Sequence, residues 1–431
     1  MLTILFGSTS WGATYFVSTS GNNSSNGSQS APWQTIQHAL DNIVSGDTVI
    51  INAGIYQENV TSRTNGTSSN RINIKANANV ILRGRIYLRH SYITVEGFEI
   101  TNSGERQAIL ADRNANHIEI LNNDIHDLGS GAIFIELPRS EGIPTAPMRW
   151  IIRGNRLYGQ GSATIYILLG GVGHTIENNE IGPGVVSEDA FRPFGDNHVI
   201  RNNYIHDIQS GGGHTDLMQI FSSNNWRVSN LLFEKNYIRG WDGQAWMFSV
   251  TPNSERITIR NNIFENVRSA GQSYCPLTKV YNNTFINSGF GNCRVIMMRG
   301  ESGRGIANNS EVMNNIFYHT GCDENDGWYS VDSVVSGFVG DYNLIFPNKN
   351  GFSENHGING LNPRFINAEG SDFHLSSNSP AIDAGTMQSG FNDDYDGNVR
   401  PSGAEWDIGA FEFIGQAING VAPPKNVRII D

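Results

Sequence analysis

The sequence predicts an all-β protein: a single-stranded, right-handed parallel β-helix (a solenoid) with an amphipathic helix capping its N-terminal end. Two observations predict this fold. An Asn-Asn-x-apolar unit recurs along most of the chain, and a short strand of alternating apolar and polar residues precedes it. No amphipathic helical pattern lies between the units, so the repeats are expected to stack as strands.

The repeat unit occurs in six full copies and three variants. The full copies begin at Asn122, Asn178, Asn202, Asn261, Asn282 and Asn314, and the variants at Gly154, Lys235 and Tyr342. Between the second residues of successive units the step is 21 to 33 residues, which is one coil with loops of different length. Asparagine tolerates the left-handed conformation of a tight bend and can hydrogen-bond its counterpart in the next coil.

The strands before the units, at residues 117–121, 150–153, 198–201 and 257–260, alternate apolar and polar side chains. Alternation places one side of a strand in the core and the other in water. We therefore expect parallel, in-register stacking from about residue 49 to residue 343. An ordinary β-sandwich is the alternative.

The two ends of a solenoid need covering, because an open coil exposes strand edges. Residues 32–41 form the one clear amphipathic helical pattern and suit the N-terminal cap, and residues 46–56 suit the first coil. We assign residues 14–415 to one β-helix domain with a C-terminal cap at about 370–415. Residues 1–13 are interpreted as the remnant of a secretory signal peptide, with an ordinary strand as the alternative, and 416–431 as a linker or tail.

Composition limits the partners. The formal net charge of −12 argues against nucleic acid, and no apolar run is long enough to span a membrane. Only 16% of residues are charged, and the lysines are few, so arginine supplies nearly all positive charge. Arginine is the better residue for holding a carboxylate in a bidentate fork. We expect a secreted monomer.

The three cysteines fit no metal-ligand spacing. Cys275 and Cys293 lie about one coil apart, so in an oxidising compartment they could form a disulfide. The alternative is that Cys275, Cys293 and Cys322 are all buried and unpaired.

Both ends of the chain resemble a family of secreted β-helix proteins that includes pectate and alginate lyases and mannuronan epimerases. The opening segments 15–22, 32–36 and 46–49 are similar to the start of such chains. The segments 379–385, 396–401 and Asp-Ile-Gly-Ala-Phe-Glu at 407–412 are similar to their closing segment. The resemblance implies the fold and specifies a reaction only weakly, because this fold hosts lyases, hydrolases, epimerases and adhesins. The acidic residues of the closing segment could hold calcium or, as we prefer, form a structural turn: Asp393, Asp394, Asp396 and Asp407.

Polar residues that recur at one repeat position are expected to be architectural. His126 and His206 occupy identical positions after their asparagine pairs, each followed by an aspartate. His174 and His198 both lie five residues before the second asparagine, and His117 is similar. We expect these histidines to stabilise the coil.

The stretch from 187 to 221 departs from the repeat. The segments 189–195 and 216–222 align without gaps, which places Asp189 over Asp216 and Arg192 over Gln219. Adjacent strands lie about 4.8 Å apart, so the two carboxylates need a metal, an arginine or a retained proton. His214 follows three glycines and falls outside the histidine positions. We predict a catalytic cluster of His214, Arg192, Asp189 and Asp216; the alternative is a polar ladder or a structural calcium site.

Other residues are expected to complete the site. Glu188 and Gln219 extend the cluster, and Tyr166 and Trp246 on the adjoining coils are predicted to stack on sugar rings. Tyr204 and Lys235 are held in reserve as bases and substrate contacts. A calcium ion bound by Asp189, Asp216 and Glu188 is the one cofactor considered.

Three functions compete. A polysaccharide lyase acting on a uronate polymer is favoured, with Arg192 or calcium neutralising the uronate carboxylate and His214 removing the C5 proton. A glycoside hydrolase would use paired carboxylates from Glu188, Asp189 and Asp216. The order of an acidic pair and then Gly-His is similar to polygalacturonases, whose other signatures are missing. A non-catalytic glycan-binding adhesin is the third class.

Overall fold

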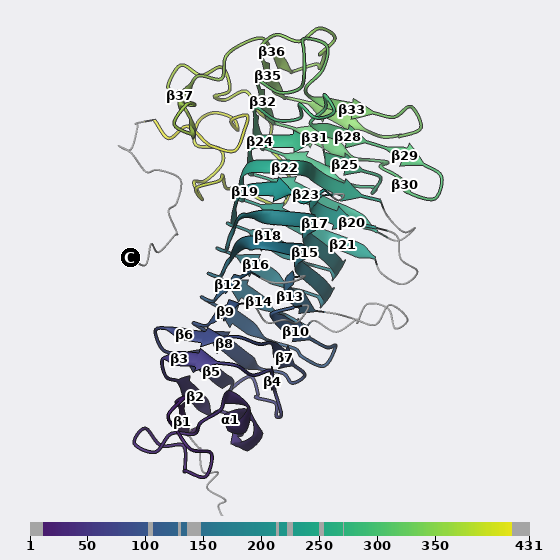
Figure 1. Cartoon of the computed structure of the whole chain (residues 1–431). Helices are drawn as coiled ribbons and strands as arrows, with labels where there is room; N and C mark the ends of the chain where they lie inside the picture. The colour runs from purple at the N-terminus through teal and green to yellow at the C-terminus, as the bar shows by residue number, and fades with distance from the viewer. Residues whose placement is uncertain are drawn as a thin grey trace, which may run out of the picture.

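The coils stack into one elongated solenoid (Figure 1), as the repeat predicts. The computed structural model describes residues 12–101, 107–127, 131–135, 148–212, 215–221, 227–249, 254–269 and 271–415. The predicted signal remnant therefore lies almost wholly outside the described residues, as does the predicted tail at 416–431. Within the described part, no helix is long and apolar enough to cross a membrane.

Each coil supplies short strands to three parallel faces. The first face carries the candidate site, and its strands pair in parallel along the solenoid. They are β4 (Val60–Thr61), β7 (Ile86–Leu88), β10 (Ile109–Ala111), β13 (Gly131–Ile135), the later parts of β15 (Arg156–Val172) and β17 (Glu180–Asp196), β20 (Asp216–Ile220), the end of β22 (Tyr237–Phe248), β25 (Gly271–Ser273), β28 (Ile296–Met298) and β33 (Tyr329–Val331).

The second face precedes the asparagine bends. It consists of β1 (Thr14–Val17), β2 (Thr48–Ile51), β5 (Ile72–Ala76), β8 (Ile93–Glu96), β11 (Glu119–Leu121), β14 (Ile151–Arg153), β16 (Thr175–Glu177), β18 (Val199–Arg201), β21 (Val228–Glu234), β23 (Glu255–Arg260), β26 (Lys279–Tyr281), β31 (Glu311–Met313) and β34 (Val339–Asp341). Its parallel, in-register pairing confirms the predicted stacking and extends it beyond the predicted start.

The third face follows the bends. It consists of β3 (Gly54–Tyr56), β6 (Val80–Leu82), β9 (Glu99–Thr101), β12 (Asp124–His126), the beginnings of β15, β17 and β22, β19 (Tyr204–Ser210), β24 (Ile263–Ser269), β27 (Thr284–Ile286), β32 (Ile316–Tyr318), β35 (Leu344–Phe346) and β36 (Ile358–Asn359). Two antiparallel pairs lie outside the faces: β29 (Gly300–Glu301) with β30 (Gly305–Ile306), and β37 (Phe365–Asn367) with β38 (Asp372–Leu375).

An asparagine ladder joins the coils at the bend between the second and third faces. The backbone N–H and Nδ2 of Asn236 both donate to Oδ1 of Asn262, at 2.9 and 3.1 Å. Glu354 ends the ladder by accepting both groups of Asn343. The same double contact links all successive rungs, which are Asn123, Asn155, Asn179, Asn203, Asn236, Asn262, Asn283, Asn315 and Asn343.

The first asparagine of each pair has a different task. Asn122, Asn178 and Asn202 all have φ of +54°, the left-handed conformation that lets the chain turn between two faces. Inside the coil the apolar side chains stack rung upon rung, as in Phe264 on Phe285, whose ring centroids lie 4.8 Å apart. Both repeat positions therefore take the roles that the sequence predicts.

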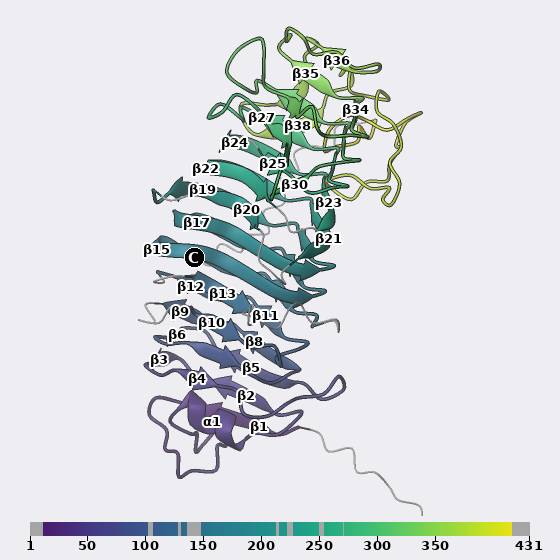
Figure 2. The ribbon, with the colours of Figure 1, turned by 90° about the vertical axis from the view of Figure 1, so that its right-hand side faces the viewer.

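The predicted N-terminal cap is a short helix, α1 (Ile36–Asn42), at the base of the solenoid (Figure 2). Thr35 caps it by accepting from the N–H of His38, and Ile36, Ala39 and Leu40 are buried. Trp33 forms an isolated parallel bridge with Val17 instead of a helical turn, so the helix begins later than the sequence predicts.

The closing segment lies along the side of the last coils (Figure 1). Nδ2 of Asn261 donates to the carbonyl of Asp393, and Nδ2 of Asn314 to that of Thr386. The reason is that the third face bears outward apolar side chains here, such as Ile316, which Leu375, Ala381 and Ile408 cover.

The acidic residues of the closing segment are engaged in turns and ion pairs. Asp394 accepts from the N–H groups of Asn398 and Glu412, and Asp407 from those of Asp383 and Phe413. Asp393 pairs with Lys235, Asp396 with His374, and Arg400 with Glu412, an ion pair with no exposed surface. These contacts are those of a structural turn.

Candidate functional site

The two aspartates of the predicted cluster lie directly opposite each other in neighbouring coils. Asp189 of β17 pairs in register with Asp216 of β20, and Phe191 with Met218. The gap-free alignment of the two segments is therefore correct. Neither aspartate has exposed surface, and because alternate residues of a strand share a side, Asp189 follows the core residue Phe191 inward.

Burial changes the protonation of this pair. It raises the pKa of Asp189 to about 7; Arg192 opposes this shift and Asp216 adds to it. Burial likewise raises the pKa of Asp216 to about 7, against the hydrogen bond that Gln219 donates at 3.0 Å. Oδ1 of Asp189 has no hydrogen-bond partner among the described residues. Near neutral pH the pair therefore retains proton occupancy that exposed aspartates would have lost.

Arg192 connects the buried pair to the surface. Its Nε donates to Asp189 and its Nη2 to Glu188, and the guanidinium lies 5.4 Å from the ring centroid of Phe221. The side chain of Arg192 is 16% exposed and that of Glu188 is 41% exposed. Two carboxylates and a ring therefore hold the guanidinium of Arg192 in one orientation.

His214 lies outside the described residues, as does Gly213. The described neighbour Thr215 is buried, and its hydroxyl lies 2.9 Å from that of Ser210. The role of His214 as a base thus stays a prediction from the sequence.

Tyr166 and Trp246 do not offer their rings to solvent, which corrects their predicted role in sugar stacking. Tyr166 is 3% exposed and Trp246 has no exposed surface. Trp246 is in register with Met218, so it points the same way into the core. The alternation of these strands, rather than the aromatic character of the residues, decides which side they face.

Tyr204 and Lys235 belong to another part of the coil. Tyr204 is in register with Glu180, nine residues before Asp189 on β17, and its ring stacks on His206. Nζ of Lys235 contacts Oδ2 of Asp393 at 2.6 Å. The structure therefore brings Glu188, Asp189, Arg192, Asp216 and Gln219 together and leaves these two reserve residues elsewhere.

Family models match two adjoining parts of the chain. Residues 15–141 match the Pel9A-like right-handed β-helix region, and residues 141–310 match the right-handed β-helix region. This chain is a right-handed β-helix protein. The comparison with curated proteins gives no match.

Solved structures share the architecture of this β-helix at low identity. XylC in complex with xylose has a TM-score of 0.61 and 13% identity, over 93% of this chain and 98% of that one. The pectate lyase Pel9A has 0.53 and 17%, over 94% and 97%. A rhamnogalacturonan lyase has 0.50 and 16%, over 82% and 91%. At these identities the likeness shows the fold.

The recurring histidines of the β-helix are held by structural contacts. Nδ1 of His126 and of His206 each lie 2.9 Å from Oδ2 of the following aspartate. The rings of His174 and His198 stack at 4.9 Å inside the coil, and Nδ1 of each accepts a backbone N–H. Burial lowers the pKa of His198 to about 4, so it is neutral in the folded protein.

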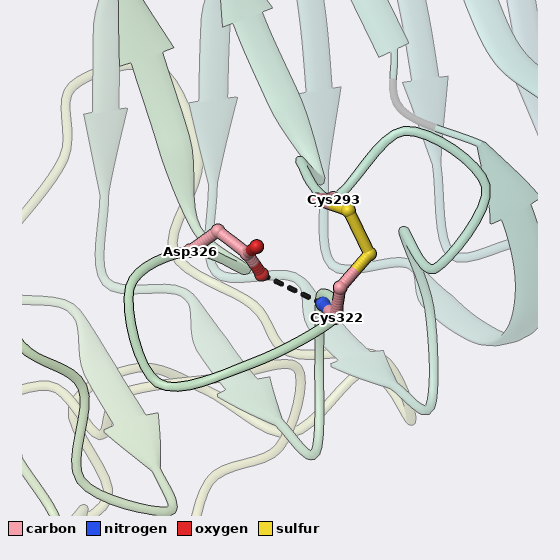
Figure 3. Close-up of side chains that lie close together, drawn as sticks. All are labelled: Cys293, Cys322 and Asp326. Carbon is pink, nitrogen blue, oxygen red and sulfur yellow. Dashed lines mark hydrogen bonds between the residues drawn. A yellow bond between two sulfur atoms is a disulfide. The ribbon is translucent and has the colours of Figure 1, made fainter.

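The cysteines pair differently from the prediction. Cys293 and Cys322 form a disulfide, with Asp326 accepting the N–H of Cys322 at 2.7 Å (Figure 3). Cys275 is buried and free, and it lies in the bend between β25 and β26. Among the described residues, one group has ligand atoms close enough together to hold a metal ion: Cys293, Cys322 and Asp326. The disulfide occupies both sulfurs of this group.

A pocket on the turn between the first and second faces was not predicted. It has a volume of about 530 Å³, and its lining includes Arg71, His117, Arg149 and Gly173. The sequence separates these residues by up to four coils, and His117 had been explained as a recurring position. Only the left-handed turn residues common to successive coils could have indicated it.

Proposed function

We propose that this β-helix is a polysaccharide lyase, which cleaves a uronate-containing glycan by β-elimination. The observation that carries the proposal is Arg192, a partly exposed guanidinium held by Asp189 and Glu188 beside the Asp189–Asp216 pair. The similarity in fold to a pectate lyase and a rhamnogalacturonan lyase supports this class of substrate.

In this reaction Arg192 neutralises the uronate carboxylate, which makes the C5 proton more acidic. His214 takes that proton, a C4–C5 double bond forms, and the glycosidic oxygen at C4 leaves with its electron pair. In the sequence, His214 lies two residues before Asp216. Asp189 and Asp216 have no exposed surface, and we assign them to positioning Arg192 and Gln219.

Glycoside hydrolysis is the second candidate, favoured by the raised pKa values of Asp189 and Asp216. A carboxyl group with a pKa of about 7 can still hold a proton at neutral pH and act as a general acid. Because both carboxyl groups are covered, this reaction would also need the pair to become accessible to a sugar.

Calcium is the alternative to Arg192 as the neutralising cation. Asp189, Asp216 and Glu188 would have to supply its oxygen ligands. Two of these residues already contact the guanidinium of Arg192, so the cluster fits an arginine better than a metal ion. We therefore expect activity to survive chelation; loss of both activity and thermal stability with a chelator would favour calcium.

The test uses pectin, alginate, hyaluronan and neutral glycans, followed by ultraviolet absorbance of unsaturated ends and by reducing ends. We expect unsaturated product from an acidic glycan and its loss in Arg192→Gln. The matched control is Arg227→Gln, an exposed arginine paired with Asp196 on the turn at the end of β17. Reducing ends without unsaturation would favour the hydrolase, and no product from any glycan would favour a binding protein.

We also propose that the protein is secreted. The Cys293–Cys322 disulfide supports this, because such bonds persist mainly in oxidising compartments. When the freshly isolated protein is denatured without a reducing agent, thiol titration should detect one thiol, from Cys275. Detection of three thiols in freshly isolated protein would contradict the proposal.

A further inference from the structure

The pocket between the first and second faces is built on four successive turns. His117, Arg149, Gly173 and Asn197 occupy one position in consecutive coils, with φ of +55°, +50°, +78° and +60°. Gly173 has no side chain, so the column of turn side chains is interrupted between Arg149 and Asn197. All four residues line the pocket, which lies at this interruption.

Most of the charges around the pocket are already offset. Nη2 of Arg71 lies 3.6 Å from Oε1 of Glu119 and donates to the carbonyl of His117 at 2.8 Å. The other oxygen of Glu119 accepts from the hydroxyl of Thr94. Arg149 is exposed, and its guanidinium has no carboxylate partner among the residues that the structure describes. Among the described residues that line the pocket, Arg149 is therefore the charge without a counterion.

The remaining lining residues suit a sugar ring, which has polar hydroxyl groups at its edge and apolar C–H groups on its faces. The strand residues Ile151 and Thr175 are in register and half-buried, and Val172 adds apolar surface. The ring of His117 is held against Tyr92 at 4.5 Å. Nδ1 of His117 is buried without a hydrogen-bond partner among the described residues, a state that an added polar group usually relieves.

We propose that this pocket binds one carboxylate-bearing sugar unit of an acidic polysaccharide, with Arg149 holding the carboxylate and Ile151 and Val172 packing against the ring. The proposal rests on the proposed function and deepens it, because it assigns a substrate-holding subsite outside the catalytic cluster. Asn197 directly follows β17, the strand that carries Asp189, so the pocket lies around the next corner of the same coil.

The volume of the pocket and the charge of its lining favour a sugar acid as the ligand. The pocket falls in the range of small-molecule sites, about 300–1,000 Å³, and combines one cation with apolar lining. A simple anion would use only Arg149, whereas a uronate unit would use the cation, the hydroxyl of Thr175 and the apolar surface together.

The test is calorimetric titration of the Arg192→Gln protein, which removes the anion contact of the catalytic cluster. The probes are a galacturonate trisaccharide, the corresponding neutral galactose trisaccharide and inorganic phosphate. We expect only the acidic trisaccharide to bind well, and Arg149→Gln in this background to weaken it by about tenfold or more, as for loss of a charge-assisted contact.

The matched control is Arg256→Gln. Arg256 occupies the same turn column further along the solenoid, with φ of +58°, and pairs with Glu255 outside the pocket. Its replacement should leave the affinity unchanged. Thermal melting confirms that each variant is folded.

Equal affinity of the Arg149→Gln and parent proteins, or equal affinity for the acidic and neutral trisaccharides, would overturn the proposal. Binding of phosphate as tightly as the sugar acid would reduce the pocket to a simple anion site, and would also overturn it. If the protein cleaves acidic glycans but Arg149→Gln leaves the affinity unchanged, this inference alone is contradicted. A protein that binds through Arg149 but cleaves nothing would sink the lyase proposal alone.

Discussion

Asp189 lies beside Asp216 in the neighbouring coil, and both carboxyl groups are withdrawn from solvent. Like charges at the spacing of adjacent strands are tolerated only with compensation. Here the compensation consists of Arg192, Gln219 and pKa values raised to about 7. The partly exposed members of the cluster are Glu188, Arg192 and Gln219.

This pair should make stability fall as the pH rises. In the unfolded chain the two carboxyl groups ionise near pH 4, whereas the folded protein retains their protons to about pH 7. The free energy of unfolding should thus decrease between about pH 4 and 7 and level off above. In Asp216→Asn this decrease should be smaller, as measured by denaturant unfolding at several pH values.

A suitable control is Asp242→Asn, an exposed aspartate of the next coil that pairs with Arg268. It should keep the pH dependence of the parent protein. Identical pH profiles for Asp216→Asn and the parent would show that the pair does not hold protons.

His214→Ala should reduce turnover by about two to four orders of magnitude, the usual range for loss of a general base. The melting temperature should change little, because we expect an exposed side chain with few packing contacts. Turnover and melting are measured on the same preparations with the glycan that the panel identifies. Retention of more than about a tenth of the turnover would exclude His214 as the base.

His206→Gln should lower stability and leave the turnover of the folded protein nearly unchanged. Burial lowers the pKa of His206, but Glu180 and Asp207 outweigh it and raise the pKa overall. Its stabilising contribution is therefore full below the ordinary histidine pKa and is lost as the pH rises through the raised value. Melting curves should show a larger deficit at pH 5.5 than at pH 8.

The contribution of His198 to stability depends on pH in the opposite direction. Its folded pKa of about 4 means that stability is lost as the pH falls from about 6.5 toward 4, since only the unfolded chain is readily protonated.

For His206, a stability deficit of the His206→Gln protein that grew toward alkaline pH would contradict the assignment of charge to this histidine. Loss of activity at an unchanged melting temperature would give it a catalytic role.

Asn236→Ala should be among the most damaging single substitutions outside the cluster. Oδ1 of Asn236 accepts two groups of Asn203, and its Nδ2 donates to Ile200 and Asn262. Since buried partners would be left unsatisfied, we expect a loss of roughly 3 kcal/mol or more in the free energy of unfolding. Asn202→Gly, at an exposed left-handed position, should cost far less, and equal losses would contradict the ladder's role.

The sequence by itself determined the solenoid, the register of its coils and the ladder that joins them. It could do so because strand alternation and the left-handed bend are local, and their spacing repeats from Asn123 to Asn343. The same register placed Asp189 over Asp216. The location of the acidic cluster therefore followed from the chain alone.

The tertiary structure decided which side chains reach solvent and which distant segments meet. Trp246 points into the core and Lys235 contacts Asp393, because strand parity and the returning closing segment fix their surroundings. The pairing of Cys293 with Cys322 and the pocket beside Arg149 also arise from coils brought together in space. Sequence spacing identifies neighbours along the solenoid axis, but only the folded coil shows what each side chain faces.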